Sequence, residues 1–273
     1  MQGLVPALTI DHLRVAHPDQ SGRPLLSVDS LTLVPGQWIA LVGANGAGKS
    51  SLLRHLAIDR PPGVRLQDRG LADWTASERA RRMAWLPQGG LMSGGAGQNA
   101  AGLGSALSVR QVALLGRAPW LGLLGAPGPV DHAAVDDALR ETGLEALADR
   151  PVGSLSGGEQ QRALLARLFA TQAAVMLLDE PFAHLDPPHQ RQVLLALRRR
   201  CAAGACALSV VHDLNLALSA DAIVIVQKGQ ALPARAPGDP HLHKDLLEAF
   251  GQAIEMLAHP DGRRWIAVPV TAP

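Results

Sequence analysis

The sequence predicts an α/β protein with an antiparallel β-subdomain and an inserted α-helical subdomain. An apolar run, Trp38 to Val42, leads into a glycine loop and then into the helix-like stretch Ser51 to Leu56. Two stretches with alternating apolar residues precede this run, and a long segment of helical periodicity interrupts the chain after it. We expect one domain, with a core at about 1–88 and 171–235, a helical subdomain at about 89–170 and a C-terminal extension at about 236–273.

The N-terminal part reads as an antiparallel sheet. Residues 7–15 (ALTIDHLRV) and 25–34 (LLSVDSLTLV) show the apolar alternation of strands. Pro35 and Gly36 form the turn between the second stretch and the apolar run that begins at Trp38. This sheet therefore leads directly into the glycine loop.

The glycine loop has the pattern of a phosphate-binding site. GANGAGKS matches G-x-x-x-x-G-K-[ST] at every fixed position, between a predicted strand and a predicted helix. Glycines allow several backbone N–H groups to converge on one anion, Lys49 would reach the β- and γ-phosphates, and Ser50 would hold a magnesium ion. The alternative is a plain glycine turn. The candidate nucleotide-binding residues are Gly43, Ala44, Asn45, Gly46, Ala47, Gly48, Lys49, Ser50 and Ser51.

The middle of the chain predicts an insertion. Residues 61–82 contain turns and an arginine-rich helical stretch, and Met83 to Pro87 is a short strand that ends at Gln88. The segment Gly89 to Leu107 is uncharged and rich in glycine and alanine, which favours a flexible loop. Helical patterns follow from Ser108 to about residue 154 and predict a small helical subdomain.

Three further motifs follow the insertion. LSGGEQQR (155–162) opens a helix, VMLLDEP (175–181) is a buried strand that ends in two acids, and SVVHDLN is a strand that ends at His212. Asp179 is placed to bind magnesium, directly or through water, and Glu180 to polarise an attacking water. On their own, these acids also suit a solvated strand end, and His212 also suits an ordinary surface position.

Taken together, the motifs strongly resemble those of the ATP-binding cassette family, in family order from residue 43 to residue 212. The resemblance implies a RecA-like P-loop NTPase core that binds ATP and Mg²⁺, with Glu180 as general base. It also implies that Gln88 senses magnesium and water and that His212 contacts the γ-phosphate. Without it, Gln88 is a plain loop glutamine. The signature residues are Ser156, Gly157, Gly158 and Glu159.

The signature residues indicate that a single chain does not form a complete ATP-hydrolysing site. Ser156, Gly157 and Gly158 place a hydroxyl and N–H groups at a helix start, which makes a second anion site or merely a capped turn. In the family, two chains join head to tail, so that each signature meets the γ-phosphate held by the other chain. We therefore expect a homodimer that ATP closes and hydrolysis releases.

One departure from the family concerns adenine. The family usually stacks an aromatic residue, often tyrosine, on the base, and this chain has no tyrosine. His17 is the nearest candidate by position, either as a weak stacking partner or as a loop histidine. The loop after Gln88 is also longer than is usual in the family.

The resemblance extends to a subfamily. A single phosphate loop and a single signature argue against tandem cassettes, whereas GRAPW (116–120), HLDPPHQ (184–190) and HDLNLAL (212–218) resemble importers of haem, iron-siderophores and vitamin B12. Haem is the first expectation and siderophore the second. Such a subunit would sit on the cytoplasmic side of the inner membrane with two copies of a permease, served by a periplasmic binding protein. We expect the permease's cytoplasmic helix to dock on the exposed apolar surface of the helical subdomain, near Trp120 and the glycine-rich loop after Gln88.

Composition limits the other classes. Hydrophobic residues make up 47% and charged residues 18% of 273 residues, and a net charge of +1 gives no signal for nucleic acid. Apolar runs stay below the roughly 18 residues of a spanning helix, and the N-terminus lacks the pattern of a secretion signal. Cys201 and Cys206 suit a reduced pair better than a metal site. A soluble assembly scaffold of the iron-sulfur biogenesis type and a kinase are the competing interpretations.

Overall fold

A computed structural model describes residues 5–17, 24–89, 106–122, 125–250, 254–259 and 265–269. The chain forms two compact units. Unit 1 comprises Met1–Asp73 and Cys206–Pro273, and unit 2 comprises Trp74–Ala205. Each unit is considered by itself below, and the predicted subdomain boundaries stay a prediction.

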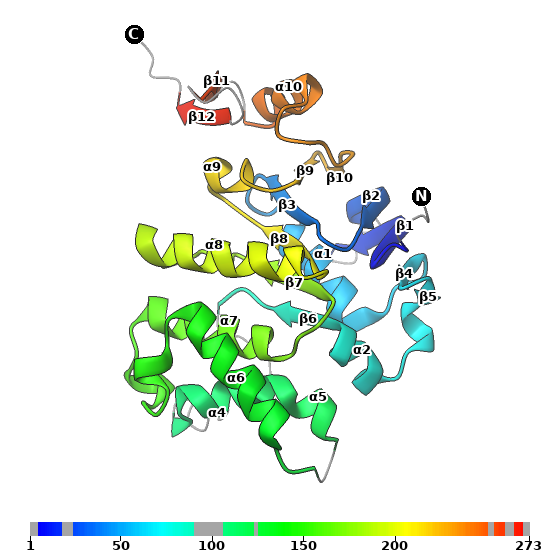
Figure 1. The fold of residues 1–273 in the computed structure, drawn as a ribbon. Helices are drawn as coiled ribbons and strands as arrows, with labels where there is room; N and C mark the ends of the chain where they lie inside the picture. The colour runs from blue at the N-terminus through cyan, green and yellow to red at the C-terminus, as the bar shows by residue number, and fades with distance from the viewer. Residues whose placement is uncertain are drawn as a thin grey trace. The chain divides into compact units, whose positions relative to one another are not determined.

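The described part of unit 1 contains a large mixed sheet with the strand order β5-β4-β1-β2-β10-β9-β3-β8 (Figure 1). Its strands are β1 (Leu8–Ala16), β2 (Pro24–Leu33), β3 (Trp38–Gly43), β4 (Val64–Leu66), β5 (Arg69–Gly70), β8 (Cys206–Val210), β9 (Ala222–Gln227) and β10 (Gln230–Ala231).

The first half of this sheet is antiparallel, as predicted. β1 pairs with β2 from Leu8 opposite Leu33 to Ala16 opposite Pro24, and β4 pairs antiparallel with the other edge of β1. Leu8, Ile10 and Leu33 are fully buried, because alternate residues of a strand point to the same face. The two alternating stretches of the sequence are thus confirmed as strands.

The second half of the sheet is parallel and centred on β3. β3 lies between β8 and β9 and runs parallel to both. Every residue of β3 is buried, which explains why its sequence is a continuous apolar run rather than an alternating one. The Trp38 indole N–H donates to Ser209 Oγ (2.6 Å), so this polar group has a hydrogen-bond partner inside the core.

Short helices and a hairpin complete unit 1. They are α1 (Lys49–Arg54), which continues into a π-helical turn (η1, His55–Asp59), η2 (Leu71–Asp73), α9 (Leu214–Ala217) and α10 (Pro240–Ala249). β11 (Ile254–Ala258) and β12 (Trp265–Pro269) form a separate two-stranded antiparallel sheet near the C-terminus. The described part of the tail therefore contains one helix and a two-stranded sheet.

Unit 2 combines a parallel strand pair with a group of helices. β6 (Met83–Leu86) pairs with β7 (Val175–Asp179). Figure 1 shows α4, α6 and α7 packed side by side, which agrees with the helical subdomain expected from the sequence. The helices are α2 (Ala76–Arg82), α4 (Val109–Leu114), α5 (Ala118–Leu121), α6 (Pro129–Thr142), α7 (Gly157–Ala170) and α8 (Pro187–Ala202), with 3₁₀ turns at Leu115–Arg117, Glu145–Leu147 and Val152–Ser154.

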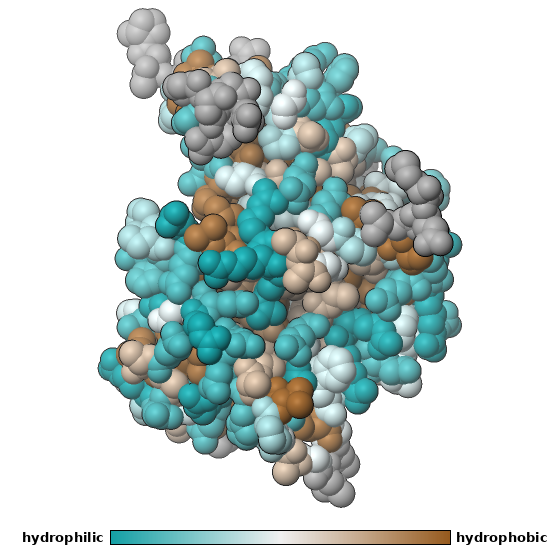
Figure 2. Space-filling model, viewed as in Figure 1, coloured by the Kyte–Doolittle hydropathy of each residue, from teal (hydrophilic) through white to brown (hydrophobic). Residues whose placement is uncertain are grey.

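The surface of the protein carries both polar and apolar side chains. The face seen in Figure 2 is largely hydrophilic, with apolar side chains in separate groups. Among the described residues, no helix has both the length and the apolar character needed to cross a membrane. Cys201 lies in α8 of unit 2 and Cys206 in β8 of unit 1, and both are buried. Most of the predicted Gly89 to Leu107 loop, residues 90–105, lies outside the described residues.

Candidate nucleotide-binding site

The phosphate loop joins β3 to α1 in unit 1, in the predicted strand-loop-helix context. Gly43 and Gly48 have φ values of 146° and 94°, and Gly46 has 78°. A Cβ at Gly43 would lie 2.3 Å from the carbonyl oxygen of Val226, and one at Gly48 would lie 3.0 Å from Leu25. The loop therefore needs glycine for its backbone angles at three positions and for close packing at two of them.

Lys49 places a buried cation against this loop. Its side chain is almost fully buried, and its Nζ donates to the carbonyl oxygens of Gly43 (2.8 Å) and Ala44 (2.9 Å). Lys49 is also the first residue of α1, and Gly48 at the N-cap has no side chain with which to cover the first N–H groups of the helix. A cationic amine and the N-terminal end of a helix thus meet at one loop, which fits a phosphate group. Asn45 and Ala47 lie within the loop, and Ser50 and Ser51 in the first turn of α1.

His212 also belongs to unit 1. It follows β8 and immediately precedes Asp213, the N-cap of α9, whose Oδ1 accepts from the N–H groups of Asn215 (2.8 Å) and Leu216 (3.3 Å). His17 directly follows β1 and is partly buried. Its suggested contact with adenine stays a prediction.

In unit 2, the structure brings Gln88 and Glu180 together. Gln88 follows β6 and Glu180 follows β7, and Gln88 Nε2 donates to Glu180 Oε1. These two strands are parallel neighbours, so their carboxyl ends meet at the same edge. Asp179, the last residue of β7, is buried at this edge, with 3% of its surface exposed. Gln88 and the two acids at the end of VMLLDEP thus form one cluster rather than two separate features.

Glu180 has an unusual backbone. Its φ is 52°, in the left-handed region that residues other than glycine rarely adopt. The turn after it is closed by the N–H of Ala183, which donates to the Glu180 carbonyl oxygen (3.1 Å), and Gln161 Nε2 of α7 donates to the same oxygen (3.1 Å). Strained backbone of this kind persists where the surroundings hold it, and it concentrates at functional sites.

The signature residues form the N-terminus of α7. Ser156 is the N-cap, and its N–H and Oγ both donate to Glu159 Oε2 (2.8 and 2.9 Å), while the Glu159 N–H donates back to Ser156 Oγ (3.3 Å). This is a reciprocal capping box. The Ser156 backbone N–H, followed by its hydroxyl, holds the pKa of the Glu159 carboxyl below its usual range. The helix start is therefore closed by this capping box, and the lowered pKa favours the ionised carboxylate at its third residue.

Gly157 and Gly158 have different surroundings. A Cβ at Gly158 would lie 2.8 Å from the carbonyl oxygen of His184, whereas one at Gly157 would have no heavy atom within 4 Å. Gly158 is thus required for close packing against His184 and Leu185. Gly157 leaves the helix start open on its other side.

A hollow of about 290 Å³ separates the start of α7 from the start of α8. Three of its residues were not identified from the sequence as site residues: Arg162, His184 and His189. Arg162 is buried, which lowers the pKa of its guanidinium, and its Nη1 donates to the carbonyl oxygens of Thr142 and Gly143 (both 3.0 Å). The LSGGEQQR and HLDPPHQ strings contain these residues, but only the fold brings them together. The other lining residues are Ser156, Gly158, Glu159, Leu185 and Asp186.

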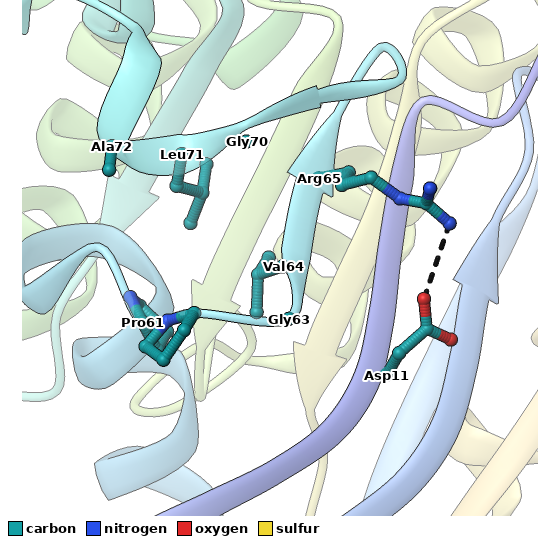
Figure 3. A pocket seen from close by; sticks show the side chains of 9 residues that line it. Asp11, Pro61, Gly63, Val64, Arg65, Gly70, Leu71 and Ala72 are labelled. Carbon is teal, nitrogen blue, oxygen red and sulfur yellow. Dashed lines mark hydrogen bonds and ion pairs between the residues drawn. The ribbon is translucent and has the colours of Figure 1, made fainter.

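A second hollow, of about 340 Å³, lies on the antiparallel part of unit 1 (Figure 3). Figure 3 shows Pro61, Val64 and Leu71 around it, with the ion pair of Arg65 and Asp11 (3.3 Å) at one side. None of its lining residues belongs to a predicted motif. The surroundings are mainly apolar and both charged groups are paired with each other, so this hollow does not resemble a phosphate site.

Comparison with known proteins agrees with this geometry. A family model described as ABC transporter matches residues 26–183. The hemin import ATP-binding protein of Streptomyces coelicolor is 39% identical over 256 residues, which cover 92% of this chain and 87% of that protein. That of Rhodococcus jostii is 39% identical over 246 residues, which cover 88% of this chain and 80% of that protein.

Solved structures show the same fold. A metal-chelate type ABC transporter in an inward-facing conformation aligns with a TM-score of 0.75 and 24% identity, covering 97% of this chain and 98% of that one. The ATP binding subunit of an ABC transporter aligns with a TM-score of 0.68 and 23% identity, covering 90% and 93%. Fold and loop define a P-loop nucleotide-binding protein. The chain belongs to the ABC transporter family, whose members bind and hydrolyse ATP.

Proposed function

We propose that this chain is the ATP-hydrolysing subunit of an importer that takes up haem through a separate membrane permease. The observation that carries the proposal is the 39% identity to hemin import ATP-binding proteins over about nine-tenths of the chain. Uptake of an iron-siderophore or of vitamin B12 is the alternative within the same class. The ATPase motifs are common to all of them, because the ATPase subunit does not touch the cargo.

The chemistry would follow from the residues described above. The loop Gly43 to Ser51 would bind the phosphates, with Lys49 on the β- and γ-phosphates. Glu180 would accept a proton from the attacking water, oriented by Gln88, and His212 would contact the γ-phosphate. These roles rest on the resemblance of the motifs and on the Gln88–Glu180 hydrogen bond.

A magnesium ion would be held by Ser50, Gln88 and Asp179. Carboxylate and hydroxyl oxygens are ligands that Mg²⁺ prefers, and the buried carboxylate of Asp179 is the kind of group that a cation stabilises. When bound, the ion supplies charge neutralisation on the phosphates. We further propose that two copies of the chain form a head-to-tail dimer, in which Ser156, Gly157, Gly158 and Glu159 of one copy face the nucleotide of the other.

The proposed docking surface for the permease is the surroundings of Trp120 in unit 2. Trp120 is 42% exposed and Leu115 is 47% exposed, although large apolar side chains usually avoid water. Figure 2 shows apolar side chains gathered over the region where Figure 1 draws α5 and the start of α6. The guanidinium of Arg81 lies 5.3 Å from the centroid of the Trp120 ring, and Arg81 Nε donates to the Pro119 carbonyl oxygen (2.8 Å). The exposed ring is therefore held in place.

The test is purification of the tagged chain from detergent-solubilised native membranes, followed by ATPase assays with cargo-loaded binding proteins. We expect a polytopic membrane protein to copurify and the haem-loaded binding protein to stimulate hydrolysis more than siderophore- or vitamin B12-loaded ones. Stimulation only by another cargo would correct the substrate. Recovery of soluble partners alone would favour the assembly-scaffold interpretation, and a phosphorylated small-molecule product would favour a kinase.

The same preparation tests the docking surface. Trp120→Glu should abolish copurification of the permease, while the ATPase activity of the isolated chain is retained. Leu195→Glu is the matched control, because Leu195 of α8 is similarly exposed (40%) and lies outside the proposed surface. If the Trp120→Glu complex assembles normally, the permease docks elsewhere.

A further inference from the structure

Asn215 connects the segment after His212 to the C-terminal hairpin. Its Nδ2 donates to the carbonyl oxygen of Ala267 (3.2 Å), and the N–H of Ala267 donates to its Oδ1 (2.9 Å). The side-chain amide thus pairs with both polar backbone groups of one strand residue, as a neighbouring strand would. The two residues are 52 positions apart, so this contact depends on the tertiary fold.

The geometry of the hairpin makes this pairing specific. In the register of β11 and β12, Ala267 lies opposite Met256. The N–H and C=O of one strand residue point to the same side, and those of Ala267 point to Asn215. β12 therefore pairs with β11 along one edge, and Asn215 forms hydrogen bonds with Ala267 on its other edge. Ala267 is also the most buried residue of β12.

The hairpin has a second attachment, to α10. The rings of Trp265 and His243 meet edge-to-face with centroids 4.1 Å apart, and His243 Nε2 lies 2.7 Å from the Pro237 carbonyl oxygen. Leu242 and Leu246 of α10 are fully buried, and α10 packs against β9, which pairs with β3. The hairpin thus joins α9 to a firmly packed helix of the same unit.

Helix α9 is a single turn that contacts β12 and β3. It has four residues, Leu214–Ala217, and its N-cap Asp213 directly follows His212. The backbone N–H of Asn215 donates to Asp213 Oδ1, while the Asn215 side chain donates to Ala267 of the hairpin. A helix of one turn has little stability of its own, so the position of this segment depends on its tertiary contacts.

We propose that Asn215 is a positioning residue that uses the C-terminal hairpin to hold His212 in its working position. This inference rests on the proposed role of His212 in ATP hydrolysis. The hairpin fixes Asn215, Asn215 and Asp213 fix the start of α9, and the start of α9 determines where the histidine side chain begins. The C-terminal extension thereby acts on turnover without contacting the nucleotide.

The experiment compares steady-state ATP hydrolysis by the full-length chain carrying Asn215→Leu or Ala267→Pro. Leucine removes the amide at similar volume, and proline removes the N–H that Asn215 accepts while suiting an edge position of a strand. We expect each variant to lower kcat by about twofold to tenfold, the range that a lost hydrogen-bonded pair supports, with KM for ATP unchanged. The double variant should be no slower than the slower single variant, because both remove one contact.

Two controls separate the possible failures. Lys244→Ala changes an exposed residue of α10 and should leave kcat unchanged. His212→Ala should abolish turnover. If His212→Ala retains turnover, the proposed role of His212 is wrong. If His212→Ala is inactive but Asn215→Leu has the wild-type kcat, or lowers it only together with KM and the unfolding temperature, this inference alone is overturned.

Discussion

At the scale of single residues, Glu180 combines the features expected of a group placed for chemistry. Its carboxylate accepts a hydrogen bond from Gln88, its carbonyl oxygen is held by Gln161, and its backbone has a left-handed φ of 52°. A residue that only ended a strand would not need a conformation that costs of order 1–3 kcal/mol. We infer that the fold holds this carboxylate in a defined direction.

Replacing the Glu180 carboxylate by an amide tests its role. Glu180→Gln keeps the shape and most hydrogen bonds but removes the base, so turnover should fall by about 100- to 10,000-fold while ATP binding is retained. Single-turnover hydrolysis and equilibrium binding of ATP measure the two effects separately. Glu248→Gln, an exposed position on α10, is the control and should hydrolyse ATP normally. Near-normal turnover of Glu180→Gln would assign the base to another residue.

At the scale of elements, Arg117 of the GRAPW string links several helices of unit 2. Arg117 is 4% exposed, although arginine is rarely buried, and its Nε donates to Asp131 Oδ1 (2.8 Å) at the start of α6. Its Nη1 donates to the Ala170 carbonyl oxygen (3.0 Å) at the end of α7. Its guanidinium also lies 5.0 Å from the centroid of the Trp120 ring. One arginine therefore connects the exposed tryptophan to two long helices.

The Arg117–Asp131 pair should make the stability of unit 2 depend on pH. The Gly128 backbone N–H, followed by Arg117, holds the pKa of the Asp131 carboxyl below its usual range. A depressed folded-state pKa stabilises the protein above the unfolded-state pKa, and this contribution is lost as pH falls through the folded-state pKa. Asp131→Asn should therefore lower the unfolding temperature at neutral pH, and its difference from the wild type should vanish in acid.

Thermal unfolding from pH 7 down to pH 3 measures this difference. Asp137→Asn is the matched control, since Asp137 lies on the same helix in an exposed ion pair with Arg140 (2.7 Å). An exposed pair contributes little to stability, so this variant should follow the wild type throughout. An Asp131→Asn difference that stays constant with pH would show that the charge is not its cause.

At the scale of the whole molecule, ATP binding should raise the stability of the folded protein and therefore its unfolding temperature. A ligand that binds only the folded state stabilises it by mass action, by about 2.7 kcal/mol at one hundred times its Kd. Lys49 is the buried cation of the phosphate loop, and its amine donates to the carbonyl oxygens of Gly43 and Ala44. Lys49→Ala should therefore lose most of the ATP-dependent rise in unfolding temperature.

The measurement is thermal unfolding with increasing ATP in the presence of EDTA, which prevents turnover. Lys244→Ala removes a lysine of the same charge from an exposed site and should keep the full shift. Equal shifts for the wild type and Lys49→Ala would mean that Lys49 does not contribute to nucleotide affinity. Comparison with Glu180→Gln, which should shift normally, separates binding from chemistry.

Local sequence alone determined the elements and the nucleotide motifs. The alternating stretches before the loop, the apolar run of β3 and the glycine loop are decided within windows of a few residues, where side-chain period and backbone freedom act directly. The family motifs are equally local, so the class of protein was recognisable before any contact was known. Prediction of the adenine contact at His17 rested on position only.

Tertiary structure alone decided which of these local features act together. Gln88 and Glu180 are 92 residues apart, and Asn215 and Ala267 are 52 apart. The burial of Arg117 follows from three helices that meet around it rather than from the GRAPW string itself. Such contacts form only where packing brings distant segments within hydrogen-bond reach, and no period or spacing in the sequence encodes that distance.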